Sequence, residues 1–165
     1  MTFRELYETH EAHVRRFVLF LGADPFLADD LTSETFVRAW TNPAPIRQNS
    51  ARAYLFTIAR NLFRDARRRA RRHAGLDDDL PDDVATIDRQ VEGRSELGNV
   101  LHAMQALPDA DRAILLMRAQ DQLSHDEIAR ALNLSVAAVK VRLHRARQRL
   151  MRITRVEADG GSETS

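Results

Sequence analysis

The sequence predicts an all-α fold of two small helical domains joined by an acidic linker. Apolar residues recur at the three- and four-residue spacing of helices in both halves of the 165-residue chain. A stretch rich in aspartate and interrupted by Gly75, Pro81 and Gly93 separates the halves. We therefore expect domains at residues 1–74 and 95–155, a flexible linker at 75–94 and a disordered tail at 156–165.

The first two helices of the N-terminal domain follow from apolar spacing and start signals. Between Phe3 and Leu21 the apolar residues recur at helical intervals. Asp24 can cap the next helix, and Pro25 suits its first position. A second helix is therefore expected through "FLADDLTSETFVRAW" to about Thr41.

A third helix begins at Ser50 or Ala51, after a loop that holds two prolines, and reads "ARAYLFTIARNLFRDARRRARR". One face is apolar, and another carries arginines within an arc of about 60°. A solvated face is the alternative, but the run "RDARRRARR" holds a single acid, which favours contact with a phosphate backbone. We name this set the arginine ridge: Arg60, Arg64, Arg67 and Arg71.

The second domain contains the pattern of a helix-turn-helix. Ser124 and Glu127, in "SHDE", form a capping box that starts a short helix. "LNLS" then ends that helix, with Asn133 suited to a left-handed turn and Ser135 to the cap of the next helix. Amphipathic hairpins without a DNA partner look similar, so the charge of the second helix carries much of the inference.

That final helix is strongly basic opposite its apolar stripe. The stripe is expected to be core and consists of Val136, Val139, Leu143, Ala146 and Leu150. No carboxylate occurs between Ser135 and Arg155, so the cations repel one another unless a polyanion lies alongside. In a DNA major groove, Arg145 can read a guanine, Val141 can meet a thymine methyl, and Lys140 and His144 can contact neighbouring bases.

The net charge of +1 hides a strong segregation of charge. Residues 1–75 hold 13 arginines against 8 acids, and residues 107–155 hold 10 cations against 5 acids. Between them, residues 76–106 hold 2 cations against 8 acids. This pattern predicts two modules that contact a polyanion, joined by a linker that avoids or mimics it.

The composition argues against several classes of protein. With no cysteine there is no disulfide, thiolate metal site or cysteine nucleophile. No apolar run has the length of a membrane span, so the sequence predicts a soluble, cytoplasmic protein without a membrane partner. Glycine loops for phosphate and glycine elbows for a nucleophilic serine are also absent from the sequence, and we expect a non-enzyme without a cofactor.

Two segments of the sequence carry possible metal ligands, but neither has the pattern of a metal site. "DDDLPDD" lacks the glycine and the closing glutamate of an EF-hand loop. His10 and His13 are one helical turn apart, but "HEAH" has no third ligand in view and does not match HExxH. We expect two helix-surface histidines and no metal site.

Three segments of the sequence resemble a known protein family. "DDLTSETFVRAW", then "ARAYLFTIARNLFRDARRR", then "LPDADRAILLMRAQDQLSHDEIARALNLSVAAVKVRLHRARQRL" are similar, in that order, to regions 2 and 4 of the extracytoplasmic-function (ECF) group of sigma-70-family sigma factors. The resemblance covers nearly everything except the acidic linker and the tail. It implies an RNA polymerase specificity subunit, with region 2 at residues 1–74 and region 4 at 95–155.

For region 2, the resemblance implies contacts with core polymerase and with the minus-10 promoter element. The helix with "DDLTSETF" would dock on the clamp coiled coil of the beta-prime subunit through Asp30, Leu31, Glu34 and Phe36. Family members often carry glutamine where Ser33 stands. The loop from Asn42 to Ser50 would capture a base flipped out of the opened strand, with candidate contacts Arg47, Gln48 and Asn49.

For region 4, the resemblance implies recognition of the minus-35 element in duplex DNA. Base contact falls on Lys140, Val141, His144 and Arg145, and phosphate contact on Arg142, Arg147 and Arg149. Family members frequently have Gly-Thr in place of Ala137-Ala138 and serine in place of Val141, so the element read here is expected to differ from the common one. Leu115, Leu116 and Met117 would pack in the core or against the polymerase beta flap.

Two other functions stay open from the sequence. A helix-turn-helix regulator would act without replacing sigma, but it has no need for "DDLTSETF" followed by the arginine ridge. A nonspecific RNA-binding protein would bind without sequence preference and with strong salt dependence. The resemblance further implies promoter DNA as a ligand, an anti-sigma factor as a common partner in the family, and a linker that threads through polymerase channels.

Overall fold

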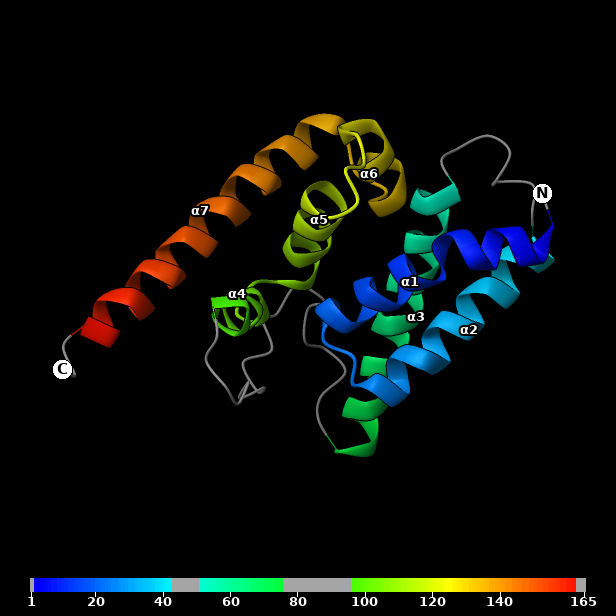
Figure 1. Cartoon of the computed structure of the whole chain (residues 1–165), viewed down its shortest axis with the longest axis horizontal. Coiled ribbons are helices and arrows are strands. Elements are labelled where there is room, and N and C mark those ends of the chain that lie inside the picture. The colour runs from blue at the N-terminus through cyan, green and yellow to red at the C-terminus, as the bar shows by residue number, and fades with distance from the viewer. Residues whose placement is uncertain (1, 43–50, 76–95, 163–165) are drawn as a thin grey trace.

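The computed structural model of the chain describes residues 2–42, 51–75 and 96–162. These residues form seven α-helices and contain no strand, which confirms the predicted all-α class (Figure 1). The first module consists of α1 (Phe3–Leu21), α2 (Pro25–Thr41) and α3 (Ala51–His73). The second module consists of α4 (Glu96–Gln105), α5 (Asp109–Ala119), α6 (His125–Leu132) and α7 (Val136–Ser162).

Local capping fixes where the helices of the first module begin and end. Thr2 and Glu5 form a reciprocal capping box at the start of α1. The carboxylate of Asp24 accepts a hydrogen bond from the Leu27 N–H at 2.8 Å, and Pro25 occupies the first turn of α2 as expected. Gly22 ends α1 with φ of 127°, a conformation that side chains disfavour.

The three helices of the first module pack on one another around an aromatic centre. α1 packs on α2 and α3, and α2 packs on α3. Phe17 of α1 stacks on Phe56 of α3 with ring centroids 4.4 Å apart. Both rings are fully buried, so the centre of this module is water-free and close-packed.

The second module has the predicted helix-turn-helix geometry. Ser124 and Glu127 form the expected capping box, and Asn133 adopts the left-handed conformation with φ of 54°. The hydroxyl of Ser135 accepts from the Ala138 N–H at 3.1 Å and so caps α7. The predicted stripe of α7 is buried at Val139, Leu143 and Ala146 and partly buried at its two ends, Val136 and Leu150.

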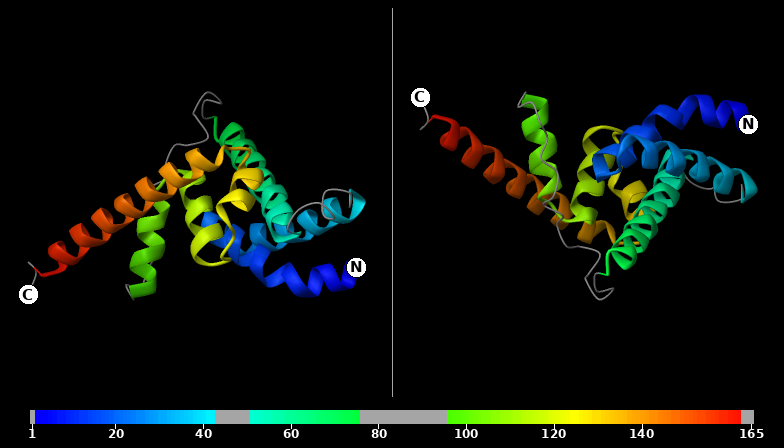
Figure 2. Two further views of the ribbon diagram at one scale, coloured as in Figure 1. Left: turned by 90° about the horizontal axis from the view of Figure 1, so that it is seen from above. Right: turned by 90° about the horizontal axis from the view of Figure 1, so that it is seen from below.

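The two modules pack against each other. α3 packs on α6, and α1 packs on both α4 and α5. The two views in Figure 2 show α5 and α6 between α7 and the first module. One continuous cluster of buried apolar residues runs through both modules and includes Leu115, Leu116 and Met117. The sequence did not predict this contact, because apolar spacing identifies a buried face but does not say what covers it.

The C-terminal end of α7 differs from the sequence prediction. The tail from residue 156 was expected to be disordered, but α7 continues to Ser162. The prediction was wrong for residues 156–162. "VEAD" contains no helix breaker, so the helix extends through it at little cost, whereas nothing local favours its continuation through Gly160 and Gly161. The part of the chain that is described contains no helix with the length and apolarity needed to cross a membrane.

The turn of the helix-turn-helix gives a direct stability test. Asn133→Ala places a side chain with no local hydrogen-bonding group in the left-handed region and is expected to lower the free energy of unfolding by about 1 kcal/mol. Asn133→Gly is expected to be close to neutral, since glycine adopts this conformation freely. Chemical denaturation followed by circular dichroism measures both.

Asn61→Ala is the matched control, because Asn61 is exposed within α3 and its replacement leaves a helical backbone unchanged. Equal stabilities of Asn133→Ala and Asn133→Gly would contradict the assigned role of the turn.

Candidate nucleic-acid interface

The N-terminal half of α7 presents a polar, basic surface to solvent. Lys140, Val141, His144 and Arg145 are all exposed, and Val141 is 48% exposed despite its apolar side chain. None of the four forms an ion pair or a side-chain hydrogen bond with another described residue. The predicted reading surface is therefore free to contact a ligand, and we name these four residues the reading surface.

The predicted phosphate contacts of α7 flank this surface and differ in exposure and in pairing. Arg142 is half-buried and Arg147 is exposed. Arg149 lies 3.7 Å from the carboxylate of Asp111 and is about half exposed. Because the side chain of Asp111 is only 11% exposed, this pair is partly desolvated, and a phosphate contact of Arg149 would compete with Asp111.

The arginine ridge of α3 faces two environments. Arg71 is partly exposed near the end of the helix, and Arg64 is half-buried. Arg60 is only 9% exposed, and the side chain of Arg67 is 16% exposed. The guanidinium of Arg67 donates to the Asp109 carboxylate of the second module at 2.6 Å. The ridge predicted to contact DNA is thus partly engaged within the chain.

The helix α2 carries an exposed acidic face on a buried apolar one. Asp30 is exposed, and Glu34 is exposed and paired with Arg38 at 3.1 Å. Leu31 and Phe36, expected among the docking residues, are buried at 6% and 1% exposure. These two side chains hold the helix on the core, and the acidic side chains remain on its exposed face.

Sequence reasoning missed two exposed apolar residues beside this acidic face. Phe26 is 85% exposed and Val37 is 52% exposed. Phe26, Asp30 and Val37 follow one another at helical spacing, which places them along one side of α2. The spacing is visible in the sequence, but apolar spacing alone does not say which apolar residues of a helix stay exposed.

An aromatic group lies at the end of the first module that precedes the loop predicted to contact the minus-10 element. Phe3 meets Trp40 edge-on at 5.5 Å and stacks near Tyr7 at 6.1 Å, and all three rings are partly exposed. The loop that follows α2, with Arg47, Gln48 and Asn49, lies outside the described residues. The assignment of these three side chains to contact with a flipped base stays a prediction.

The expectation that both histidines of "HEAH" lie on the helix surface was wrong for His10, which lies on the face of α1 that packs on the core. His10 is buried on the core face of α1, and its pKa is lowered by burial, then by the charges of Arg52 and His13. His13 lies across the module boundary from Asp121, with its Nδ1 3.0 Å from the carboxylate. Burial raises the pKa of Asp121, while His13, Arg52 and Arg16 act in the opposite direction.

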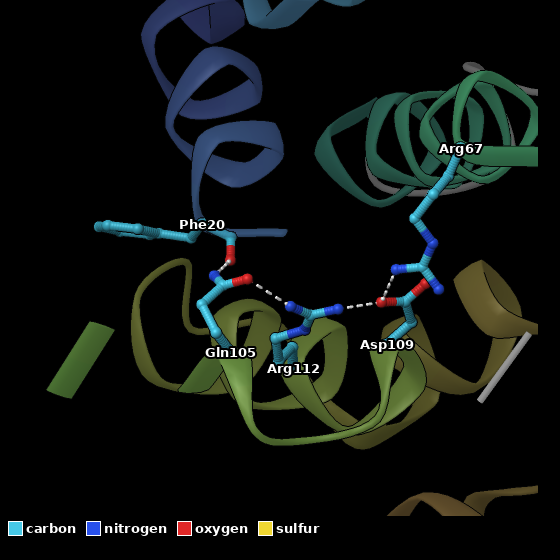
Figure 3. A network of polar contacts seen from close by, with 5 residues as sticks. All are labelled: Phe20, Arg67, Gln105, Asp109 and Arg112. Atoms are coloured by element: carbon cyan, nitrogen blue, oxygen red, sulfur yellow. Dashed lines mark hydrogen bonds and ion pairs between the residues drawn. The ribbon is translucent and has the colours of Figure 1, made fainter. Parts of the chain in front are cut away.

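A chain of polar contacts crosses between the modules twice (Figure 3). Gln105, at the end of α4, donates to the Phe20 carbonyl of α1 at 3.2 Å and accepts from Arg112 at 2.7 Å. Arg112 also donates to Asp109, which receives Arg67 of α3. The chain begins and ends in the first module and passes through the second, and we name it the junction network.

This geometry defines a class of protein: a helical, two-module DNA-binding protein with a free recognition helix and a second basic module. The protein-family model "Sigma-70 region 2" matches residues 6–73 of the sequence, and the family model "Sigma-70, region 4" matches residues 97–150. The two matched segments correspond to the two modules and leave out the acidic linker.

Curated relatives share the whole of this organisation. The chain is 34% identical to the ECF RNA polymerase sigma factor SigM of Bacillus subtilis over 91% of this chain and 93% of that protein. It is also 34% identical to the ECF RNA polymerase sigma factor SigL of Mycobacterium tuberculosis, over 92% of this chain and 87% of the relative. The chain belongs to the ECF sigma factors of the sigma-70 family, which are transcription initiation factors.

Solved structures have the same fold. The sigma factor RpoE of Bartonella quintana, in complex with the anti-sigma factor NepR, matches with a TM-score of 0.75 at 24% identity over 93% of this chain and 97% of that chain. CnrH, in complex with the cytosolic domain of CnrY, matches with a TM-score of 0.66 at 27% identity over 93% of this chain and 88% of that one.

Burial of His10 predicts a pH-dependent stability. Because its folded pKa lies below the ordinary 6.5, the unfolded chain binds more protons between the two values. The contribution of His10 is therefore fully present above pH 6.5 and declines as the pH falls, by at most about 1.4 kcal/mol per pH unit. Denaturation from pH 7.5 to pH 5.5 (about two units) measures the slope.

His10→Leu is expected to flatten this slope, because a leucine fits the apolar face of α1 and cannot be protonated. His73→Asn, at an exposed position near the end of α3, is the control and should keep the wild-type slope. A His10→Leu protein as pH-dependent as the wild type would rule out His10 as the cause.

Proposed function

We propose that this chain directs core RNA polymerase to promoters by reading a minus-35 element with α7 and supporting strand opening with the first module. The observation that carries the proposal is the reading surface: four exposed side chains, without partners in the described residues, on a helix that has no carboxylate between Ser135 and Arg155. Cations gathered on one face of a helix repel one another, and a polyanion such as DNA relieves this repulsion by neutralising their charge.

The reading surface suits the major groove residue by residue. Arg145 can donate twice to the acceptors of a guanine, and Lys140 and His144 can reach neighbouring bases. The exposed side chain of Val141 suits an apolar contact with the methyl group of a thymine. A polar side chain at this position would make a poorer contact with that methyl group. Arg142, Arg147 and Arg149 then fix the register through phosphates.

The acidic face of α2 is proposed to bind the beta-prime clamp coiled coil of core polymerase. Asp30 and Glu34 supply the charge, and the exposed Phe26 and Val37 supply apolar area beside it. Buried aromatic anchors within a polar rim are the usual source of affinity in such interfaces. Leu31 and Phe36 act from beneath by fixing the helix on the core.

Strand opening is proposed to involve the loop after α2 and the aromatic group next to it. Arg47, Gln48 and Asn49 remain the candidates for contact with the flipped base. The partly exposed rings of Phe3, Tyr7 and Trp40 lie beside the start of this loop. Exposed aromatic faces stack unpaired bases without strong sequence preference.

The remaining partners follow the same proposal. The second module is proposed to meet the polymerase beta flap, and an anti-sigma factor is proposed as a regulator, since RpoE and CnrH were each solved with such a partner or a cytosolic domain bound. We propose that the chain works in the cytoplasm as a non-catalytic subunit, with the phosphodiester chemistry left to the polymerase.

The first test is transcription in vitro with purified core polymerase on fragmented genomic DNA, with and without this protein. We expect new RNA 5′ ends that share two upstream elements and depend on the protein. A helix-turn-helix regulator instead predicts stable binding to specific duplex sites in the absence of polymerase and no new start sites, which would contradict the proposal.

Two arginines of α7 separate base reading from phosphate contact. Arg145→Ala is expected to weaken promoter binding by about 1–3 kcal/mol and to relax the preference at one base pair. Arg147→Ala is expected to weaken binding to all sequences alike and to reduce the salt slope by about 1. A promoter library bound by the polymerase complex, measured at several salt concentrations, reports both quantities.

Arg152→Ala is the matched control, because Arg152 is an exposed arginine of the same helix beyond the reading surface. All three substitutions should leave the melting temperature unchanged, since the side chains are exposed. Identical specificity profiles for Arg145→Ala and Arg147→Ala would remove the assignment of Arg145 to base contact.

A further inference from the structure

We infer that Val141 and Ala137, exposed one helical turn apart on α7, recognise the 5-methyl groups of pyrimidine bases in the major groove. Thymine presents this methyl group in the groove, and 5-methylcytosine presents the same group at the same ring position. The inference rests on the proposed function in one respect, that α7 enters a major groove. It deepens that function by assigning a ligand class, the 5-methylpyrimidines, and by adding Ala137 as a contact. We name the two residues the methyl-reading pair.

The first support is the position of the pair on the helix. At 100° per residue, Val141 lies about 180° from the centre of the buried stripe of α7. Ala137 lies about 40° from Val141 on the same exposed face, one turn nearer the start of the helix. Residues near the start of a recognition helix are those that contact base edges. The pair therefore occupies the part of α7 that would enter a groove most deeply.

This part of α7 is open to a ligand. The helix packs on α4, α5 and α6, and Figure 1 shows these three helices on one side of α7. Val141 is 48% exposed, and Ala137 is also exposed. Within the described residues, no helix covers the pair, so its methyl groups can meet another molecule without any rearrangement of the fold.

Cations border the pair on both sides and favour DNA as the ligand. Lys140 and Arg147 lie toward one edge of the exposed face. Arg142 and Arg149 lie toward the other edge. An apolar protein partner would have to desolvate these charges in return for the small apolar area of one valine and one alanine. In a major groove, the same cations can reach phosphates while the apolar pair faces the base edges.

Neither the core nor helix formation accounts for a valine at position 141. Val141 is not part of the buried apolar cluster of the protein. Valine also forms exposed helix less readily than alanine or lysine does. Its branching, however, holds a helical valine almost entirely in one rotamer, so its two methyl groups have fixed positions. A side chain that is ordered before binding loses little entropy on contact with a base.

The contact distinguishes bases by a single methyl group. Uracil differs from thymine, and cytosine from 5-methylcytosine, only in lacking this group. Burial of one methyl group against apolar side chains raises affinity roughly fourfold. Because such a contact releases no counterion, the ratio of the two affinities is expected to be independent of salt concentration. A phosphate contact behaves differently, since it ignores the base and weakens steeply as salt is added.

The test begins with short random duplexes bound to the full chain at low salt, where phosphate contacts make binding measurable. The tightest duplexes are enriched, and each thymine is then replaced singly by uracil. We expect two sensitive thymines, each losing affinity roughly fourfold. They should lie within about two base steps of each other, since one helical turn spans about 6 Å and a base step about 3.4 Å. Equal affinities for thymine and uracil at every position would overturn the inference.

A second set of duplexes separates the two sources of the methyl group. At each sensitive position, a cytosine–guanine pair replaces the thymine–adenine pair, once with cytosine and once with 5-methylcytosine. We expect the methylated duplex to bind roughly fourfold more tightly than the unmethylated one. Equal binding of the two would confine recognition to thymine and overturn the assigned ligand class.

Substitutions in the full chain identify the side chains responsible. Val141→Ala is expected to abolish the preference for thymine over uracil at one sensitive position, and Ala137→Ser to weaken it at the other. Val100→Ala is the matched control, because Val100 is an exposed valine of α4 outside the reading surface, and it should keep both preferences. Melting temperatures should agree, since all three side chains are exposed. A Val141→Ala protein that discriminates as well as Val100→Ala would overturn the inference.

The outcomes for methyl recognition and for the proposed function are distinguishable. Methyl-dependent binding that Val141→Ala abolishes, without polymerase-dependent start sites, supports methyl recognition and refutes the sigma function. Polymerase-dependent start sites that are unchanged by uracil or 5-methylcytosine in the upstream elements support the sigma function and refute methyl recognition. A thymine-to-uracil ratio that falls with salt as steeply as the total affinity would assign the difference to phosphate contacts and also refute it.

Discussion

A fully buried guanidinium must have its charge compensated inside the protein, and Asp109 of the same helix compensates Arg112 beside the boundary between the two modules. Its side chain is 0% exposed, and burial lowers its pKa while Asp109 opposes that effect. Its hydrogen-bond partners, Gln105 and Asp109, are themselves tied to Phe20 and Arg67 of the other module. Through these two partners, the buried charge of Arg112 is linked to α1 and α3 of the first module.

This constraint separates the roles of the two basic surfaces. The arginines of α3 lie near carboxylates of the second module, so part of their charge is used within the chain. The cations of the reading surface have no such neighbour and stay available. A chain of net charge +1 can therefore present one strongly basic surface while it neutralises another.

The helix α2 has one face in the core and one face exposed, where the contact with core polymerase is proposed. Leu31 and Phe36 are buried, while Asp30 and Glu34 on the same helix are exposed. The hydroxyl of Thr35 is satisfied by the Leu31 carbonyl at 2.6 Å, so a polar residue is accommodated inside without a partner from another element. A side chain of such a helix thus contributes to binding either directly or by holding its neighbours in place.

The sequence by itself determined the helices and the chemistry of the reading surface, because both follow from local rules. The capping boxes at Thr2 and Ser124, the left-handed Asn133 and the acid-free run of α7 each depend on residues a few positions apart. The family resemblance predicted sigma-70 regions 2 and 4 for the two modules, and the family comparisons confirmed both regions.

Only the tertiary structure decided which charged residues meet across the chain. The contacts of Arg67 with Asp109 and of His13 with Asp121 join residues 42 and 108 positions apart. Helical periodicity carries no information about such pairs, since it fixes the direction of a side chain on its own helix and not the neighbour it meets. The family resemblance implied that Leu31 and Phe36 belong to a docking surface, and the packing of α2 on α1 and α3 buries both side chains in the core.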